Sequence, residues 1–319
     1  PPEIEDFVLK GYEKSNFKNV LLDPDSPISD FYLITDVGTV LKVNDMGLNP
    51  EVQKVFTYDG KISEALSNDD THYLSLIGKS ETMLIATKDF LNIDTLYSET
   101  NAEITDFQID DNKIYLLSNN GVTGKIIYAA IGENNWKEKA IPDIAFNRIF
   151  VMDSLIVLYK YLGDDITLYF INNFSDNWRT KKIFEEFYKG FADLKEIKNT
   201  VALIGDSKYE SNRVYFLNNF LDYYNVDVSA IYDNILNDIG FEAGFDFRSH
   251  TLQIGNYLVN CDCGYLFRFT YNGDVEQNMY YFPNSHSLNK IKSNKRSKNI
   301  QFVAVGDDGL ILLINRSKT

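Results

Sequence analysis

The chain has little cysteine and no long apolar run. Its 319 residues include two cysteines, Cys261 and Cys263, which are separated by one position. Cysteines that close together rarely pair, so we expect a fold without disulfides, from a reducing compartment or from one where no cross-link is needed. The longest aliphatic run, "LILLI" at 310–314, is far shorter than the roughly 20 residues of a membrane helix. These absences predict a soluble protein with no membrane span.

Basic residues are also in short supply. The chain has 31 Lys and Arg against 46 Asp and Glu, a formal net charge of −15. Such an acidic balance disfavours a broad surface for nucleic acid or for an anionic membrane. The N-terminus, "PPEIEDFVLKG", is acidic and has no apolar core of the kind that a secretory signal carries. We therefore expect no secretory address in this sequence.

No metal-binding or catalytic signature stands out. The three histidines, His72, His250 and His286, are isolated from one another, and we expect them at strand edges or in loops. The two cysteines lack the second pair that a zinc site needs. Acidic pairs such as Asp307–Asp308 fall in turns, without the alternating ligands of a calcium loop. We expect no catalytic residue, no metal and no cofactor.

What the chain does contain is a repeated pair of apolar segments around a Gly, Asp or Asn turn. Examples are "DFYLITDVGTVLKV" (30–43), "KIYLLSNNGVTGKIIYAA" (113–130) and "IQFVAVGDDGLILLIN" (300–315). Apolar and aromatic runs bounded by turn formers are typical of buried hairpins. The first segments of the seven pairs are anchored at Tyr32, Tyr73, Ile114, Leu155, Val201, Tyr257 and Phe302. This regular recurrence indicates a repeat architecture.

Two weaker strands flank each pair, such as "KISEALS" (61–67) before a pair and "WKEKAIP" (136–142) after one. Four strands in each repeat are typical of a propeller blade rather than of a two-sheet sandwich. The pattern predicts an all-β fold: a single seven-bladed β-propeller over residues 1–319, built from four-stranded antiparallel blades.

The N-terminal segment supplies a strand that the last repeat lacks. The chain ends at Thr319, directly after the third strand of the seventh unit, while "EIEDFVLKGY" (3–12) has nothing else to pair with. We expect residues 1–12 to be a closing strand that pairs with 309–315, which removes two open sheet edges. "FKNVLLD" (17–23) then forms the innermost strand of the first blade.

A short motif recurs where the third strand of a unit ends, as "KDF" at 88–90 and as "NNF" at 172–174 and 218–220. Its middle residue can accept backbone N–H bonds within the turn, and its Phe is expected to pack between blades. The residues concerned are Asp89, Asn173 and Asn219, followed by Phe90, Phe174 and Phe220. Trp136 and Trp178 hold equivalent places slightly later in their units. We interpret the motif as structural.

Two insertions break the period. The segment 226–241, between units five and six, has Val228, Ile231, Ile235 and Ile239 at helical spacing and Gly240 as a stop signal. It predicts a short helix. This helix is either a surface element on the rim or a partner-docking element, with Ile231 and Ile235 as the candidate contacts. The smaller insertion, 184–194, is aromatic-rich, and the pattern leaves its shape open.

The run "NKIKSNKRSKN" (289–299) concentrates positive charge in an acidic protein. Its basic residues are Lys290, Lys292, Lys295, Arg296 and Lys298. One interpretation is a solvated loop before the last hairpin. The other is a docking element for an acidic neighbour, which is another copy of the chain or a nucleic acid.

Several phrases resemble the repeats of known propellers. "QFVAVGDDGLILLINRSK" (301–318) is similar to the repeat of phage tail propellers, and photosystem assembly factor-like propellers share this style. "INNFSDNW" (171–178) resembles the Asp-box of sialidase-like propellers, with Asn173 in place of its Asp and Ser175 in place of its Gly. Sialidases also place an arginine in their first blades, whereas the first arginine here is Arg148. The resemblance implies a binding or structural propeller, often part of a virion tail, nozzle or baseplate.

These observations predict a non-enzymatic propeller that mediates protein docking or host attachment in a virion. The expected partners are other subunits of that assembly, with a host-surface glycan or protein as a further possibility. The protein would then be located in the virion, assembled in the host cytoplasm, and otherwise in the cytoplasm. The alternative is a carbohydrate-active propeller, either a glycan-binding lectin or a sialidase-like hydrolase.

Overall fold

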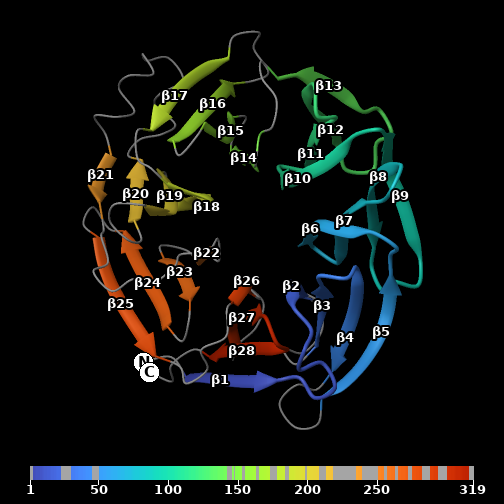
Figure 1. Ribbon diagram of the computed structural model, residues 1–319, viewed down its shortest axis with the longest axis vertical. Helices are drawn as coiled ribbons and strands as arrows, with labels where there is room; N and C mark the ends of the chain where they lie inside the picture. Colours follow the sequence, from blue (N-terminus) through green and yellow to red (C-terminus); the bar gives the residue numbers. More distant parts are fainter. Residues whose placement is uncertain are drawn as a thin grey trace.

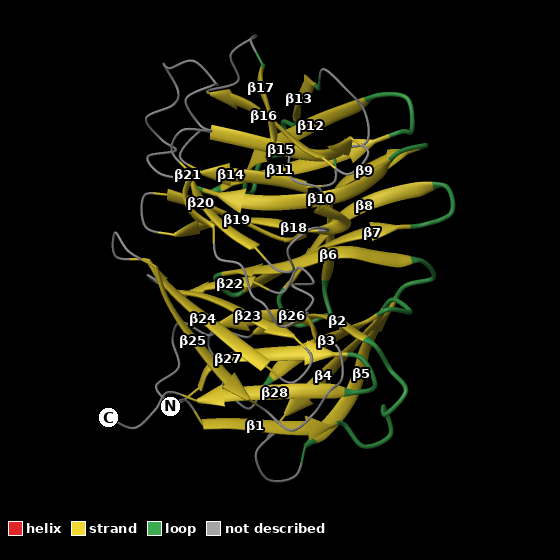
Figure 2. Ribbon diagram, turned by 60° about the vertical axis from the view of Figure 1, so that its left-hand side comes forward, coloured by secondary structure: helices red, strands yellow, loops and turns green. Residues whose placement is uncertain are grey.

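The computed structural model of the chain consists of strands and the turns between them. It describes residues 3–22, 30–44, 50–141, 146, 148–152, 155–162, 165–172, 178–183, 187–197, 200–207, 213–217, 235–238, 251–254, 257–262, 265–271, 275–281, 288–293 and 300–315. Figure 2 shows strands and connecting loops in this part of the chain. No helix within these ranges is long and apolar enough to cross a membrane.

The described strands form seven four-stranded antiparallel sheets. Sheet 1 contains β2 (Phe17–Leu22), β3 (Phe31–Thr35), β4 (Thr39–Asn44) and β5 (Glu51–Thr57). Sheet 2 contains β6 (Lys61–Asn68), β7 (Thr71–Ile77), β8 (Glu81–Thr87) and β9 (Ile93–Thr100). Sheet 3 contains β10 (Glu103–Asp110), β11 (Lys113–Asn119), β12 (Gly124–Ala130) and β13 (Lys137–Ala140).

The second half of the chain repeats this order. Sheet 4 contains β14 (Arg148–Met152), β15 (Leu155–Leu162), β16 (Asp165–Asn172) and β17 (Arg179–Ile183). Sheet 5 contains β18 (Phe187–Ile197), β19 (Thr200–Ser207), β20 (Arg213–Leu217) and β21 (Ile235–Asp238). Sheet 6 contains β22 (Thr251–Ile254), β23 (Tyr257–Asp262), β24 (Tyr265–Tyr271) and β25 (Val275–Tyr281). Sheet 7 contains β26 (Leu288–Ser293), β27 (Ile300–Gly306), β28 (Leu310–Asn315) and β1 (Glu3–Val8).

The sheets lie around a common centre (Figure 1). Their first strands are innermost and contact one another in the order β2, β6, β10, β14, β18, β22 and β26, and β26 in turn contacts β2. The predicted hairpin anchors all fall on the second strand of a sheet, from Tyr32 on β3 to Phe302 on β27. The expectation of an all-β fold of four-stranded antiparallel sheets is therefore confirmed.

The hydrophobic core lies between neighbouring sheets. Phe31 and Leu33 on β3 pack with residues of sheet 7 such as Val303, whereas Tyr32 on the same strand packs with residues of sheet 2 such as Leu74. Successive side chains of a strand point to opposite faces. A middle strand that is covered on both faces is therefore apolar along most of its length, as "FYLIT" is on β3, where all of the residues are buried.

The N-terminal strand completes sheet 7. β1 pairs antiparallel with β28, from Glu3 opposite Asn315 to Val8 opposite Leu310. The Leu9 N–H donates to the Gly309 carbonyl oxygen over 3.0 Å, and the Leu9 side chain is buried in the core between sheets 7 and 1. This is the pairing expected for the N-terminal segment, with the strand ending at Val8.

The helix expected over 226–241 is wrong at the four residues of that range that the structure describes. Ile235–Asp238 form strand β21, which pairs with β20 and supplies the fourth strand of sheet 5. The reason is that β20 would otherwise expose its unpaired backbone edge, and pairing there outweighs the local helical spacing. The rest of 226–241 lies outside the described residues. In the insertion 184–194, whose shape the pattern left open, residues from Phe187 onward belong to β18.

Candidate functional site

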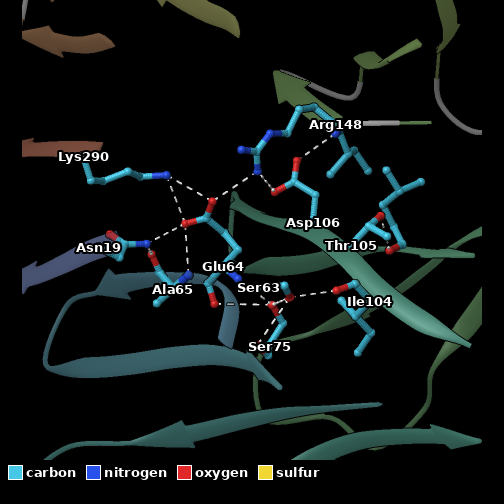
Figure 3. A network of polar contacts seen from close by, with 12 residues as sticks. Asn19, Ser63, Glu64, Ala65, Ser75, Ile104, Thr105, Asp106, Arg148 and Lys290 are labelled. Carbon is cyan, nitrogen blue, oxygen red and sulfur yellow. Dashed lines mark hydrogen bonds and ion pairs between the residues drawn. The ribbon is translucent and has the colours of Figure 1, made fainter. Parts of the chain in front are cut away.

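A β-bulge recurs near the start of the innermost strands. The register shifts between Phe17 and Asn19, between Ile62 and Glu64, between Ile104 and Asp106, and between Leu288 and Lys290. Each bulge is followed by a polar residue, and Arg148 holds the corresponding position at the start of β14. We refer to Asn19, Glu64, Asp106, Arg148 and Lys290 as the ring residues. They come from sheets 1, 2, 3, 4 and 7 and converge at the centre of the molecule (Figure 3).

The Glu64 carboxylate accepts hydrogen bonds from three of the other ring residues. Lys290 Nζ lies 3.1 Å from both carboxylate oxygens of Glu64, and Arg148 Nη1 lies 3.3 Å from Oε2. Asn19 Nδ2 donates to Oε1 over 2.8 Å, and the Ala65 backbone N–H donates to the same oxygen. The Glu64 side chain is only 10% exposed.

The charges around Glu64 keep it ionised. Burial alone would raise the pKa of Glu64, because it penalises the charged form. The positive charges of Lys290, Arg148 and Lys292, with the Ala65 N–H bond, outweigh burial and hold that pKa well below its usual value. Glu64 therefore acts as an ionised acceptor for cations from sheets 4 and 7.

Asp106 has the opposite electrostatic balance. Its Oδ1 lies 3.4 Å from Arg148 Nη1, and its Oδ2 accepts the Ile149 N–H over 2.9 Å. Burial raises the pKa of Asp106 to about 6, and the negative charge of Glu64 adds to the rise, whereas Arg148 opposes it. The pKa values of these two neighbouring carboxylates are thus shifted in opposite directions, because Glu64 is nearer to the cations.

Hydroxyl groups next to the bulges connect sheets 2 and 3. Ser63 Oγ lies 2.6 Å from Ser75 Oγ and donates to the Ile104 carbonyl oxygen over 2.9 Å. Thr82 Oγ1 accepts the Ile104 N–H over 3.1 Å. These bonds give both backbone polar groups of Ile104, beside the bulge of β10, a partner from sheet 2.

A small pocket of about 90 Å³ adjoins the ring residues. It is lined by Lys18, Asn19, Ile34, Ile62, Ser63, Glu64, Arg148, Asn289 and Lys290. Lys18 pairs with Asp307 at 3.1 Å, and Asn289 donates to the same carboxylate. Because the Glu64 carboxylate is held by two cations and an amide, Glu64 itself is placed to clamp these side chains rather than to transfer a proton.

A larger hollow of about 410 Å³ lies between sheets 2 and 3. It is lined by residues 78–81 at the β7–β8 turn, by 101–102 of the β9–β10 connection, by Glu103 and Thr105 at the start of β10, and by 119–121 at the β11–β12 turn. In an antiparallel four-stranded sheet, the turn after the second strand and the connection after the fourth leave from the same end. We refer to this end of the sheets as the turn face. The ring residues lie near it, because each is among the first residues of its strand.

Among the described residues, Val37 and Val122 are the most exposed large apolar side chains on the turn face. Val37, in the β3–β4 turn, is 69% exposed, and Val122, in the β11–β12 turn, is 75% exposed. Val122 directly follows Gly121, which lines the larger hollow. Leu91, in the β8–β9 turn of the opposite end, is 82% exposed.

The candidate docking residues that the structure describes lie on two different strands, β26 and β21. Lys290 and Lys292 lie on strand β26, so the expectation of a solvated loop is wrong for these two positions. Lys290 is drawn inward by Glu64 and is 23% exposed. Lys295, Arg296, Lys298 and Ile231 lie outside the described residues, and Ile235 begins strand β21.

Of the ring residues, only Lys290 was proposed from the sequence as a site residue; Asn19, Glu64, Asp106 and Arg148 were missed, although a signal was present. Aligned at the bulge, the strands read "FKN" (17–19), "ISE" (62–64), "ITD" (104–106), "FNR" (146–148) and "LNK" (288–290). In each triplet an apolar residue is followed two positions later by a polar one. His72 lies next to the start of strand β7, where it is 1% exposed and stacks on Phe90. His250 and His286 lie outside the described residues.

The structural interpretation of the "KDF" turn is confirmed. Asp89 Oδ1 accepts the N–H groups of Leu91 and Asn92 at 2.9 and 3.2 Å. Phe90 is buried between sheets 1 and 2. Trp136 packs between sheets 2 and 3, and Trp178 between sheets 3 and 4. The two "NNF" motifs lie outside the described residues, except for Asn172 at the end of β16.

Comparison with known proteins identifies the fold. No family model matches the chain, and no curated protein matches its sequence. Among solved structures, a structure of RRP9 WD40 repeats matches with a TM-score of 0.67 at 10% identity, over 98% of this chain and all (100%) of that one. A structure described as YCF48 bound to D1 peptide matches with a TM-score of 0.65 at 11% identity, over 97% and 96% of the two chains. BamB from Moraxella catarrhalis matches with a TM-score of 0.54 at 12% identity, over 94% and 85%.

At identities this low the likeness shows the fold alone. The chain has a β-propeller fold, and the resemblance to propeller repeats seen in its sequence is confirmed at that level. The link to phage tails stays a prediction.

Proposed function

We propose that the chain is a seven-bladed propeller that works as a non-enzymatic, protein-binding component of a larger assembly, most specifically of a virion tail, nozzle or baseplate. The unbroken order of innermost strands from β2 to β26 and back to β2 supports the blade count. The similar structure of YCF48 bound to D1 peptide supports protein binding, because that propeller holds a peptide. The virion assignment is supported by the similarity of 301–318 to phage tail repeats.

The observation that carries this proposal is the contrast between the centre and the turn face. At the centre the Glu64 carboxylate is held by charged partners from other sheets, which stabilises the ring instead of leaving a free acid or base. On the turn face, a hollow of about 410 Å³ lies beside Val122, and Val37 is exposed on the same face. Concave surfaces with exposed apolar side chains are typical of protein-interaction sites.

The test uses a pair of exposed valines and a matched control. An affinity-tagged chain is cross-linked in a lysate of the source organism, and the captured proteins are quantified by mass spectrometry. We expect a defined set of proteins with the wild type, a strong loss with the double variant Val37→Asp and Val122→Asp, and no loss with Leu91→Asp. Equal capture by all three chains would contradict a binding role for the turn face.

Two further measurements test the finer parts of the proposal. Antiserum against the chain should detect it in density-gradient fractions of virions from the source culture, and its absence from those fractions would exclude the virion assignment. A glycan array and a panel of chromogenic glycosides should both be negative. Saturable glycan binding or turnover would favour the carbohydrate-active alternative instead. The docking role of Lys295, Arg296, Lys298 and Ile231 stays a prediction, to be tested by replacing them with Ser.

A further inference from the structure

The larger hollow between sheets 2 and 3 is lined by two carboxylates that have no partner among the described residues. Glu81 lies at the start of β8 and Glu103 at the start of β10, and both residues are exposed. All the lining residues belong to 50–141, a stretch that the structure describes without a gap. Within the described chain, neither carboxylate accepts a hydrogen bond or joins an ion pair. The hollow therefore offers acceptors for a positively charged group.

The cation in this lining is directed elsewhere. Among the described lining residues the positive charge comes from Lys79. Its Nζ lies 3.9 Å from Oδ2 of Asp59, in the β5–β6 turn, and its side chain is 90% exposed. Lys79 therefore faces the side of sheet 1 and makes no direct pair with Glu81 or Glu103.

Closely packed glycines hold the wall of the hollow on the side of sheet 1. The ring of Tyr58 lies so near Gly60 that a Cβ there would be 2.6 Å from Cε1, and its hydroxyl lies so near Gly78 that a Cβ there would be 2.5 Å from it. Gly78 lines the hollow, so the Tyr58 hydroxyl lies at its margin. Burial raises the pKa of Tyr58, and the negative charge of Glu81 adds to the rise. This wall is preformed and carries a protonated hydroxyl.

The β11–β12 turn forms the opposite wall. Asn119 Oδ1 accepts the Gly121 N–H over 2.7 Å. Asn120 Oδ1 accepts the N–H groups of Val122 and Thr123 over 2.9 and 2.7 Å. The amide oxygens thus hold the turn, whereas the side-chain NH₂ groups of both Asn residues donate to no described residue. These groups are available for the main-chain carbonyl oxygens of a bound chain.

The size and the chemistry of the hollow fit a basic side chain that is attached to a polypeptide. Its volume of about 410 Å³ lies within the range of roughly 300–1,000 Å³ that ligand pockets have. Carboxylates bind guanidinium and ammonium groups with charge-assisted hydrogen bonds. Val122, which is 75% exposed at the edge of the hollow, offers an apolar contact for the aliphatic stem of Lys or Arg. The net charge of −15 attracts a basic partner over a longer distance.

We propose that the hollow between sheets 2 and 3 binds an arginine or lysine side chain of a basic polypeptide that docks on the turn face. Glu81 and Glu103 bind the cationic end of that side chain, and Asn119 and Asn120 donate to the main chain that carries it. The proposal rests on the protein-binding function above and adds the chemical class of the partner to it.

The direct test measures, by fluorescence anisotropy, the binding of a labelled hexapeptide in which arginine alternates with glycine. A lysine–glycine peptide has the same charge. In a third peptide citrulline replaces arginine, which keeps the shape of the side chain and removes its charge. We expect saturable binding of the arginine and lysine peptides that weakens as salt rises, and no saturable binding of the citrulline peptide.

A pair of double variants separates the hollow from the acidity of the whole chain. Glu81→Gln with Glu103→Gln should weaken binding of the arginine peptide roughly tenfold, the equivalent of losing one charged hydrogen bond. Glu51→Gln with Glu133→Gln removes the same charge at the opposite end of the sheets, at the start of β5 and in the β12–β13 turn, where both residues are exposed. This control should bind nearly as tightly as the wild type. Circular dichroism and thermal melts establish that each variant is folded.

Several outcomes would overturn the inference. It is wrong if the basic peptides do not bind the wild type, or if they bind Glu81→Gln with Glu103→Gln equally well. Equal weakening in the control variant would mean that net charge alone attracts the peptides. Spermine and calcium chloride are titrated by calorimetry. If either binds while the peptides do not, the hollow is a site for free cations, and docking of a basic chain is excluded.

The protein-binding function is decided separately by the lysate test with Val37→Asp and Val122→Asp. The carboxylates that this variant adds would strengthen a purely ionic attraction for a basic partner. A loss of capture there therefore reports the apolar contact on the turn face, whatever the peptides show about the hollow.

Discussion

At the scale of single residues, Glu64 carries the connection between sheets that are remote in the sequence. Its carboxylate joins sheet 2 to Asn19 of sheet 1, Arg148 of sheet 4 and Lys290 of sheet 7. Arg148 extends the contact to Asp106 of sheet 3. The separations of up to 226 positions between partners mean that these bonds form only when the ring closes.

Replacing Glu64 with Gln should destabilise the fold strongly. The variant leaves Lys290 and Arg148 in a partly buried site without the carboxylate that both bind, and removing one partner of a buried ion pair costs about 3 kcal/mol or more. Urea denaturation at pH 7 measures the change. The control is Glu138→Gln, because Glu138 is 55% exposed in its pair with Lys125 and should cost less than about 1 kcal/mol. Similar losses in the two variants would contradict a special role for Glu64.

Asp106 should make the stability of the fold depend on pH between 7.5 and 5. Its pKa is raised to about 6 in the folded chain, against about 3.9 for an unperturbed Asp. The folded state therefore binds this proton more tightly than the unfolded state, so the contribution of Asp106 to stability increases as pH falls through 6. Asp106→Asn has no such proton. The stability of the wild type relative to Asp106→Asn should thus rise by roughly 1 kcal/mol from pH 7.5 to pH 5.

Denaturant midpoints of both chains at the two pH values measure this difference. The range stops at pH 5 because the Glu64 pKa is shifted in the opposite direction. The stability that Glu64 contributes is present above its unfolded pKa and is lost as pH falls below it, which would obscure the effect of Asp106. If the difference in stability between the two chains stays constant, or if the wild type loses stability relative to Asp106→Asn as pH falls, the pKa of Asp106 is not raised in the folded state.

At the scale of elements, the turn after the third strand positions an aromatic residue between sheets. In sheet 2 the backbone of Phe90 has a φ of 63°, which is unusual for a bulky residue. Hydrogen bonds from the Phe90 N–H to Thr87 Oγ1 and from Leu91 and Asn92 to Asp89 hold this turn. The ring of Phe90 then stacks on His72 and contacts Tyr32. The cost of the backbone conformation is offset by this burial.

Trp178 follows β16, the third strand of sheet 4, and packs between sheets 3 and 4. Its loss should harm folding rather than binding. Trp178→Ala removes a large, partly buried side chain that packs against a core cluster including Tyr115 and Ile171, and truncating a buried Trp typically costs about 3 kcal/mol. Thermal and urea denaturation measure the loss. Leu91→Ala is the control, because Leu91 is 82% exposed and should change stability by less than about 0.5 kcal/mol. A Trp178→Ala chain with full stability and lost partner capture would place Trp178 in a binding site instead.

The elements could be predicted from the sequence where the hydrophobic pattern is strong. "FYLIT" on β3 and "THYLSLI" on β7 are buried on both faces, so their apolar runs stand out in the sequence. The helix at 226–241 failed for the opposite reason. Isoleucines four positions apart fit one face of a helix, but a short apolar segment also fits a strand, and the open edge of β20 decides between them at Ile235–Asp238.

The ring residues could not be predicted by the same pattern. A bulge inserts one extra residue and shifts the alternation of the strand, so Glu64 and Asp106 point to the centre where simple alternation would not place them. Their partners are also supplied by other sheets, and pairings such as Glu64 with Lys290 follow only from ring closure. The triplets from "FKN" to "LNK" show that alignment of the repeats would have revealed the position, but not which charges meet.

At the scale of the whole molecule, the closure of sheet 7 joins the start of the chain to its end. β1 is the outermost strand of a sheet whose other three strands come from residues 288–315. Behind β1, Leu9 is 2% exposed in the core cluster that also contains Phe17 of sheet 1 and Val305 of sheet 7. Gly309, with a φ of 76°, packs so closely on the Tyr12 carbonyl oxygen that a Cβ there would lie 2.7 Å from it. The N-terminal segment is therefore packed into the ring as well as paired along one edge.

Deleting residues 1–12 should consequently lower the melting temperature by at least about 5 °C, because it removes the six-residue pairing with β28 and the buried side chain of Leu9. It also exposes the backbone edge of β28, so the truncated chain should aggregate more readily. Differential scanning calorimetry measures the first effect and light scattering the second.

A synthetic peptide of residues 1–12, added in excess, should bind the open edge and restore much of the lost stability, since a ligand of the folded state stabilises it by mass action. The same peptide with Leu9→Asp should not, because it pairs without filling the core. An unchanged melting temperature after truncation, or equal rescue by both peptides, would mean that the ring is held together without this strand.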